Sequence, residues 1–418
     1  MLRALSAAAI LCLAGAALAA PPAPAEAAAL ASAPAHALKA RAMAQKAIAF
    51  LRSQQDEKTG GWSVPKEGPA YPAITGLVVT GMLLDPALAT DDPSIKRGLD
   101  FILSFKQADG GIYDRILPSY NTAICLSALA LAAKDGENPR PDARDAIAPA
   151  QNFLRSLQWS EDAPEDETAP ERPRRVGKEH PFYGGVGYGR SGRPDNSNLG
   201  MVIQGMHDSG LKADDVFYQR ALVFLRRTQM QGDINEMAYA ANSRQGGFIY
   251  STSVNKDQIG VGQVMIPAPN DTIDEATADG GRVSRLRAYG SMTYMGFKSL
   301  LYANLDRQDP RVRAAHGWIR RNYTLTENPG IGAEGLYYFY LTFARAMGAW
   351  GEPSVTPILE DESEGQPRQW AADLVDTLEP LQEPDGSFRP RAERWMENNK
   401  VLITAYTLIA LQHVAEAR

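Results

Sequence analysis

The pattern of apolar and polar positions repeats six times along the chain. Each repeat begins with a segment in which apolar residues recur every three or four positions between charged ones, as in residues 47–51. This spacing predicts a helix with one solvent-facing side. The second segment of each repeat is apolar on almost every side, which predicts a buried helix. These second segments are residues 73–84, 123–132, 199–206, 292–303, 336–347 and 401–411.

A glycine-rich turn separates the two helices of each repeat. The clearest turn, residues 55–62, follows the first amphipathic segment, and weaker turns lie at 184–188, 246–248 and 329–332. Glycine suits such turns because it accepts a positive φ without steric cost. The residues expected to define the structural repeat are Gln55, Gly60, Trp62, Gly110, Gly111, Gln382, Gly386 and Phe388.

A repeat of roughly 50 residues is typical of stacked units that bury their apolar faces on one another. Six exposed helices alternating with six buried ones predict an all-α fold, an (α/α)6 toroid of six helical hairpins with an inner and an outer ring. Each turn joins the end of an outer helix to the start of an inner one, so we expect all six turns at one end. We therefore expect one domain over 38–418 rather than several average domains.

Three insertions interrupt the expected toroid. Residues 161–180 are acidic and proline-rich and predict a mobile surface loop. Residues 233–285 are long and polar, with 248–250 and 261–266 as expected extended pieces, and 352–369 form an acidic linker-like stretch. Loops of this length are usually functional or disordered.

The N-terminus predicts export. Residues 1–19 combine Arg3, an apolar stretch and an Ala17-Leu18-Ala19 cleavage site, as in a secretory signal peptide. Residues 20–37 are rich in Ala and Pro and predict a disordered leader. We expect a periplasmic or extracellular protein whose single remaining cysteine, Cys125, forms no internal disulfide.

Composition excludes several classes of partner. The formal net charge is −6 and no basic stripe is present, which argues against nucleic acid. The buried segments are too short to span a bilayer, so we expect no transmembrane anchor in the mature chain. Cys125 lies in an apolar run and the histidines are scattered, so we expect neither a metal site nor a cofactor.

The turn Gln-x4-Gly-x-Trp at Gln55, Gly60 and Trp62 resembles the QW repeat of terpene cyclases such as squalene–hopene cyclase. A similar turn at 382–388 has Phe in place of Trp. The whole mature chain resembles the α/α-toroid superfamily that contains these cyclases and the protein prenyltransferase β subunits. The resemblance implies that the glutamines and aromatic residues brace the repeat rather than touch a substrate.

The same resemblance directs attention to residues 194–198. Class II cyclases carry an Asp-x-Asp-Asp motif whose central aspartic acid protonates the substrate. In the nearest match here Asp195 occupies the first acidic position, Ser197 the central position and Asn198 the third. Because serine cannot supply that proton, the resemblance implies a cyclase-like protein without its catalytic acid. Whether the chain is an enzyme stays open.

A ligand site is expected where the heads of the inner helices converge. Polar heads above apolar walls are the usual form of such a site, and six parallel helix dipoles favour an anion there, although acidic residues oppose it. Helix capping and simple filling of the barrel are the structural alternatives. The candidates are Asp195, Asn198, Arg287, Tyr289, Tyr294, Glu334 and Tyr338.

Three functions fit these observations. The first is an exported terpene-cyclase-like protein that binds an isoprenoid or another apolar ligand in a central cavity. The second is a secreted carbohydrate-active lyase or hydrolase, and the third a noncatalytic scaffold or binding protein of the cell envelope. A closed aromatic cavity would favour the first, an open groove the second and a filled barrel the third.

Overall fold

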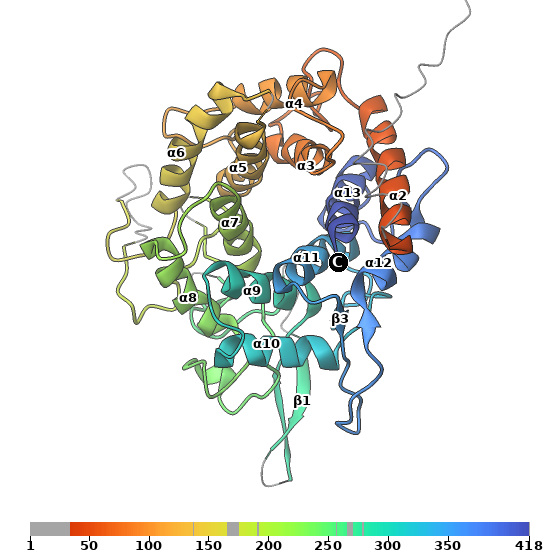
Figure 1. Ribbon diagram of the computed structural model, residues 1–418. Helices are drawn as coiled ribbons and strands as arrows, with labels where there is room; N and C mark the ends of the chain where they lie inside the picture. The colour runs from red at the N-terminus through yellow and green to blue at the C-terminus, as the bar shows by residue number, and fades with distance from the viewer. Residues whose placement is uncertain are drawn as a thin grey trace, which may run out of the picture.

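The chain folds into two concentric rings of helices (Figure 1). The computed structural model describes residues 34–136, 138–164, 175–189, 192–255, 257–265, 271–277 and 280–417. The expected signal peptide and most of the leader therefore lie outside the described residues. The first helix begins at Ala35, slightly before the expected start of the toroid at Leu38.

Inner and outer helices alternate along the chain as the apolar pattern predicts. The outer ring consists of α2 (Ala35–Ser53), α4 (Pro93–Leu103), α6 (Pro141–Ser156), α8 (Val216–Thr228), α10 (Pro310–Arg321) and α12 (Trp370–Leu378). The inner ring consists of α3 (Pro72–Leu83), α5 (Pro118–Lys134), α7 (Asn196–Asp208), α9 (Gly290–Tyr302), α11 (Leu336–Trp350) and α13 (Lys400–Glu416). Each inner helix contacts the next, and α13 returns to α3, so the ring is closed. The predicted (α/α)6 toroid is confirmed.

The glycine turns attach each outer helix to the next. Gln55 Nε2 donates to the carbonyl of Gly60 in its own turn at 2.8 Å and to that of Ser94 in α4 at 2.9 Å. Gly60 has a φ of +79°, and a Cβ there would lie 2.8 Å from the Arg97 carbonyl oxygen. Only glycine fits at this close approach with that backbone.

Three other repeats link the turn to the next outer helix in the same way. Gln158, Gln229 and Gln382 each donate to a carbonyl of their own turn and to one in the next outer helix, which for the last repeat is α2. The turn then binds its inner helix through a threonine hydroxyl that accepts a backbone N–H. The pairs are Trp62–Thr75, Ile112–Thr122, Phe248–Thr293 and Phe388–Thr404, at 2.9–3.2 Å.

The helix heads are capped either by their own side chains or by residues of other segments. Asp92 and Asp309 cap α4 and α10 with their own carboxylates, directly before a proline at the first helical position. Among the inner helices, α3, α9 and α11 have no capping side chain of their own. Their heads are capped by residues from other segments: Asn121 accepts from Ala73, Asn328 from Ser291, and Glu397 from Tyr338. This arrangement gathers polar side chains at one end of the barrel.

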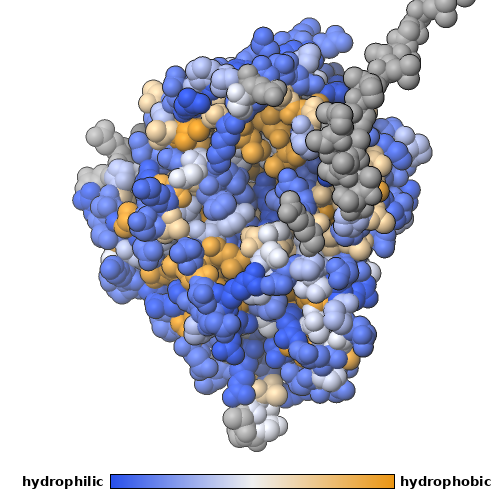
Figure 2. All heavy atoms as spheres, viewed as in Figure 1, coloured by the Kyte–Doolittle hydropathy of each residue, from blue (hydrophilic) through white to orange (hydrophobic). Residues whose placement is uncertain are grey.

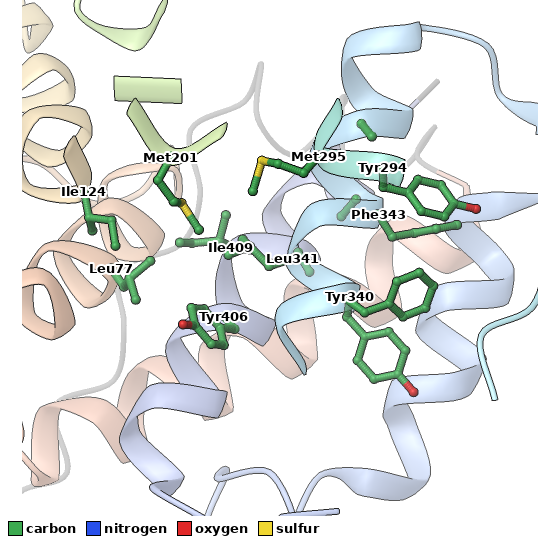
Figure 3. Close-up of a cluster of buried hydrophobic side chains, with 14 of the residues drawn as sticks. Leu77, Ile124, Met201, Tyr294, Met295, Tyr340, Leu341, Phe343, Tyr406 and Ile409 are labelled. Carbon is green, nitrogen blue, oxygen red and sulfur yellow. The ribbon is translucent and has the colours of Figure 1, made fainter. Parts of the chain in front are cut away.

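Apolar side chains close the barrel midway along its axis (Figure 3). Each inner helix contributes one of Leu77, Ile124, Met201, Met295, Leu341 and Ile409, and all six are buried. We call this set the apolar floor. Hydrophilic residues cover most of the surface seen along the barrel axis, and hydrophobic residues gather toward its centre (Figure 2).

The insertions contain the only strands among the described residues. β1 (Thr272–Ala276) and β2 (Arg282–Leu286) form an antiparallel hairpin that projects from the barrel beside α10 (Figure 1). β3 (Ser354–Val355) and β4 (Arg368–Gln369) pair at the two ends of the third insertion. The expected pieces at 248–250 and 261–266 contribute only isolated bridges, Gln229 with Phe248 and Ser251 with Gln263. Half of the 161–180 insertion, residues 165–174, lies outside the described residues.

Candidate functional site

A cavity of about 410 Å³ opens at the heads of the inner helices. We call it the head cavity. Its lining comes from every inner helix or the segment directly before it, so the heads converge as the turn pattern predicts. The lining residues are Tyr71, Ala73, Ile74, Leu77, Leu117, Tyr120, Asn121, Ile124, Tyr188, Ser197, Tyr250, Tyr289, Ser291, Met292, Tyr338, Trp395, Met396, Glu397, Leu402 and Tyr406.

Hydroxyl groups form two hydrogen-bonded clusters in this cavity. The Ser197 hydroxyl lies 2.7 Å from that of Tyr120 and 3.0 Å from that of Tyr338. The hydroxyls of Tyr188 and Tyr250 lie 2.9 Å apart, and the ring of Tyr188 stacks on that of Tyr120 at 6.1 Å between centroids. Burial raises the pKa of Tyr338 to about 12, so these groups act as neutral hydrogen-bond donors and acceptors.

Glu397 is the only carboxylate among the described residues that line the cavity, and no lysine or arginine lines it. Its Oε1 accepts the Tyr338 N–H at the head of α11 at 2.9 Å, whereas its buried Oε2 has no hydrogen-bond partner. Burial raises the pKa of Glu397 to about 7, against the opposing effect of the α11 backbone N–H groups. At neutral pH the carboxyl is therefore partly protonated and able to donate through Oε2.

The rim of the cavity contains unusual backbone. Leu117, Trp395 and Met396 have φ of +48°, +54° and +65°, a region that non-glycine residues seldom adopt. Trp395 and Met396 are 41% and 42% exposed although they line the cavity. Such conformations cluster at ligand sites, where surrounding structure holds them in place.

Asp195 and Asn198 lie directly behind the cavity wall. The Asp195 carboxylate caps α7 by accepting the Asn198 N–H at 2.8 Å, and it also accepts from Asn198 Nδ2 at 2.9 Å. Asn198 in turn accepts the Ser119 hydroxyl at 3.0 Å. Burial raises the pKa of Asp195 to about 6. Both residues act on the site through α7, because Ser197 alone of this segment lines the cavity.

The other predicted candidates divide into two groups. Tyr289 and Tyr338 line the cavity. Arg287 does not, because its guanidinium pairs with Asp271 at 2.9 Å beside the β1–β2 hairpin. Tyr294 is fully buried against Phe339 and Phe343 of α11, and Glu334 faces Arg394 at 3.7 Å. Neither of these two belongs to the lining.

The candidate set omitted several residues of the cavity. Tyr188 and Tyr250 lie in loops before α7 and in the long insertion, and Glu397 lies in an irregular loop before α13. No helical periodicity marks these positions. The sequence signal that could have found Glu397 is its place just before the last apolar segment, where an inner head is expected.

Two other predictions concern ligands and membranes. No cluster of three or more His, Cys, Asp or Glu side chains with metal-binding geometry occurs in the described part of the chain. Cys125 is a free, fully buried thiol in α5. No helix within the described residues has the length and apolarity needed to cross a bilayer.

Comparison with known proteins identifies the architecture. No protein-family model matches the sequence, and no curated protein matches it significantly. The GH76A α-1,6-mannanase of Salegentibacter superposes with a TM-score of 0.53 at 8% identity, over 90% of this chain and 99% of the mannanase. An unsaturated glucuronyl hydrolase specific for heparin gives 0.50 at 12% identity, over 90% and 97%.

The type II terpene cyclase MstE from Scytonema gives a TM-score of 0.49 at 14% identity, over 91% of this chain and 99% of the cyclase. At such low identities the matches show the fold and leave the chemistry open. The chain therefore has the α/α-toroid fold of the mannanase and the glucuronyl hydrolase.

Proposed function

We propose that this toroid is an exported protein that binds a mainly apolar molecule with a neutral polar end, such as an isoprenoid alcohol, in the head cavity. The observation that carries the proposal is the lining: apolar and aromatic walls, two hydroxyl clusters and one partly protonated carboxyl. The cavity volume of about 410 Å³ lies in the usual range for small-molecule sites.

The polar groups select a neutral end over an anion. A diphosphate needs cationic partners, and no basic side chain lines the described cavity. Glu397 Oε2 and the Ser197 hydroxyl offer hydrogen bonds to a hydroxyl or carbonyl oxygen. The positive ends of the α7 and α11 helix dipoles are already used by the carboxylates of Asp195 and Glu397.

Proton-initiated cyclisation is not part of the proposal. An alkene is a very weak base, so its protonation needs a strongly acidic donor. The Ser197 hydroxyl is far too weak an acid, and burial raises the pKa of Glu397 to about 7, which makes it a weaker acid than an ordinary carboxyl. We expect no cyclic product from squalene.

Farnesol binding tests the proposal. We expect farnesol to quench the fluorescence of Trp395 at the rim and to bind at least tenfold more tightly than farnesyl diphosphate. Ala73→Phe fills the cavity and should weaken farnesol binding at least tenfold, whereas Val216→Phe on the exposed outer surface should not. Equal affinity of both ligands, or unchanged binding in Ala73→Phe, would refute the proposed site. A cyclic product from squalene would refute the absence of cyclase activity.

A carbohydrate-active enzyme is the second candidate, because Glu397 has the raised pKa of a general acid in a tyrosine-rich cavity. Ordinary glycoside hydrolysis uses two carboxyl groups that flank the bond. Among the described lining residues Glu397 stands alone. Release of sugar from a polysaccharide by the wild type, with its loss in Glu397→Gln, would favour this candidate over the first.

A further inference from the structure

A buried polar layer lies one helical turn beyond the apolar floor, toward the C-terminal ends of the inner helices. Its residues follow those of the floor by three or four positions, which places them on the same face of each helix. All are at most 5% exposed. They are Thr80, Ser127, Gln204, Lys298, Arg345 and Gln412, one from each inner helix.

Two basic side chains lie in this layer, and burial lowers the pKa of Lys298 well below its usual value. Lys298 Nζ donates to Gln204 Oε1 at 2.6 Å and lies 5.3 Å from the centre of the Tyr302 ring. Arg345 is 5% exposed, and its buried Nε has no hydrogen-bond partner. Asp208 is the acidic group whose charge acts on both Lys298 and Arg345. The layer thus holds more positive than negative groups.

The C-terminal ends of six helices supply partial negative charge here, which favours cations. That effect is several-fold smaller than the cost of burying an uncompensated ion. Helix dipoles therefore account for the sign of the buried charge but leave the Arg345 guanidinium short of an acceptor. A hydrogen-bond acceptor on a bound molecule would satisfy this guanidinium.

A second cavity of about 660 Å³ reaches Arg345 from this end. We call it the tail cavity. Its apolar and aromatic walls include Tyr302, Met347 and Trp370, and the imidazoles of His207 and His413 also line it. His207 is held against Tyr302 by ring stacking at 3.6 Å. Two carboxyl groups also line the cavity: Glu352 is paired with Arg307, and burial raises the pKa of Glu416. Arg345 is the only lysine or arginine among the described lining residues.

We infer that the tail cavity binds a small organic carboxylate with an apolar body. The guanidinium of Arg345 holds the carboxylate, since its planar donors match two oxygens. The apolar body of the ligand lies against the aromatic walls of the tail cavity. This site is separate from the head cavity, because the apolar floor and the polar layer lie between the two.

Octanoate and its neutral analogue octanamide test this inference on the unmodified protein by titration calorimetry. We expect octanoate to bind at least tenfold more tightly. Arg345→Met should reduce octanoate affinity at least tenfold, whereas Arg226→Met on the exposed face of α8 should not change it. Ala73→Phe, which fills the head cavity, should also leave octanoate affinity unchanged.

Thermal melting without ligand separates a binding role from a structural one. If Arg345 lacks a hydrogen-bond acceptor within the chain, Arg345→Met removes a guanidinium whose burial costs more than the charge of Asp208 returns, and the variant should melt at the same or a higher temperature. A melting temperature lowered by several degrees would show that Arg345 has an internal partner and would overturn the inference. Equal affinity for octanoate and octanamide, or loss of octanoate binding in Ala73→Phe, would overturn it as well.

Discussion

The two ends of the inner ring differ in their ionisable groups. At the head end the carboxyls of Asp195 and Glu397 are buried, and at the tail end Lys298 and Arg345 are buried near the half-buried His413 and a single carboxylate, Asp208. Each end holds the sign that its helix dipoles favour. Burial still shifts each titration toward the neutral form: it raises the pKa of Glu397 to about 7 and lowers the pKa of His413 to about 4.

One barrel therefore has two unlike cavities. The head cavity is rich in hydroxyl groups, contains one partly protonated carboxyl and has no basic side chain in its described lining. The tail cavity ends on a guanidinium. A repeat of similar hairpins can therefore carry different side chains at the two ends of the barrel. The residue types on the first turn of an inner helix do not determine those on its last turn.

Trp62→Ala tests how far the head end depends on its turns and should have the largest effect. Trp62 is 1% exposed, and its Nε1 donates to the Leu51 carbonyl at 2.6 Å. We expect a loss of about 3–5 kcal/mol in the free energy of unfolding, measured with denaturant. Trp395→Ala is the matched control: this residue is 41% exposed at the rim, and its loss should cost about 1 kcal/mol or less.

Glu397→Gln tests the acidic end and should have the next largest effect. A carboxyl whose folded-state pKa exceeds its unfolded value stabilises the fold at low pH and loses that contribution as pH rises. For Glu397 the window runs from the ordinary carboxyl pKa of 4.5 to about 7. We expect wild-type stability to fall by up to about 3 kcal/mol across this window from this group.

Melting curves at pH 5 and pH 7 measure that slope. Glu397→Gln keeps an oxygen acceptor for the Tyr338 N–H but cannot ionise, so the slope should flatten. A residual slope from Asp195 should remain, because burial also raises the pKa of Asp195 to about 6. The exposed Glu360→Gln should behave as the wild type. An unchanged slope in Glu397→Gln would contradict the predicted protonation.

The fold followed from the sequence because it depends on local patterns. Helix type depends on apolar spacing within about a dozen residues, and the turns depend on glycine at positive φ, as at Gly60. The link at Gln158 was missed for a physical reason: its carbonyl partner in the turn, Gly184, is 26 residues away. The long separation hides from the sequence that Gln158 has the same role as Gln55.

The candidate site followed less completely because side-chain direction depends on distant contacts. Tyr289 and Tyr338 line the head cavity, but Tyr294 points to α11 because it lies on another face of α9. Arg287 turns to Asp271, a partner that belongs to an insertion outside the repeat. Glu397 reaches the cavity through loop backbone that has no periodic signature.

His413→Gln tests the basic end and should have the smallest effect. Burial, with Arg345 nearby, lowers the pKa of His413 to about 4 from the ordinary imidazole value of 6.5. Between these values the unfolded chain binds the proton more tightly, so the stability of the fold rises with pH. The slope is opposite to that from Glu397, as the comparison of the two ends requires. Because His413 is partly exposed, we expect about 1 kcal/mol rather than the full shift.

The measurement is the change in melting temperature between pH 5 and pH 7, in wild type, His413→Gln and the double variant with Glu397→Gln. The glutamine should steepen the net fall in stability with rising pH, because it removes an opposing contribution. Two groups at opposite ends of the barrel should act independently, so the double variant should show the sum of the single effects. A slope that flattens in His413→Gln would mean that the imidazole is charged in the fold. The tail end would then hold a further cation. Burial would not lower the pKa of His413 in the way that it raises the pKa of Glu397.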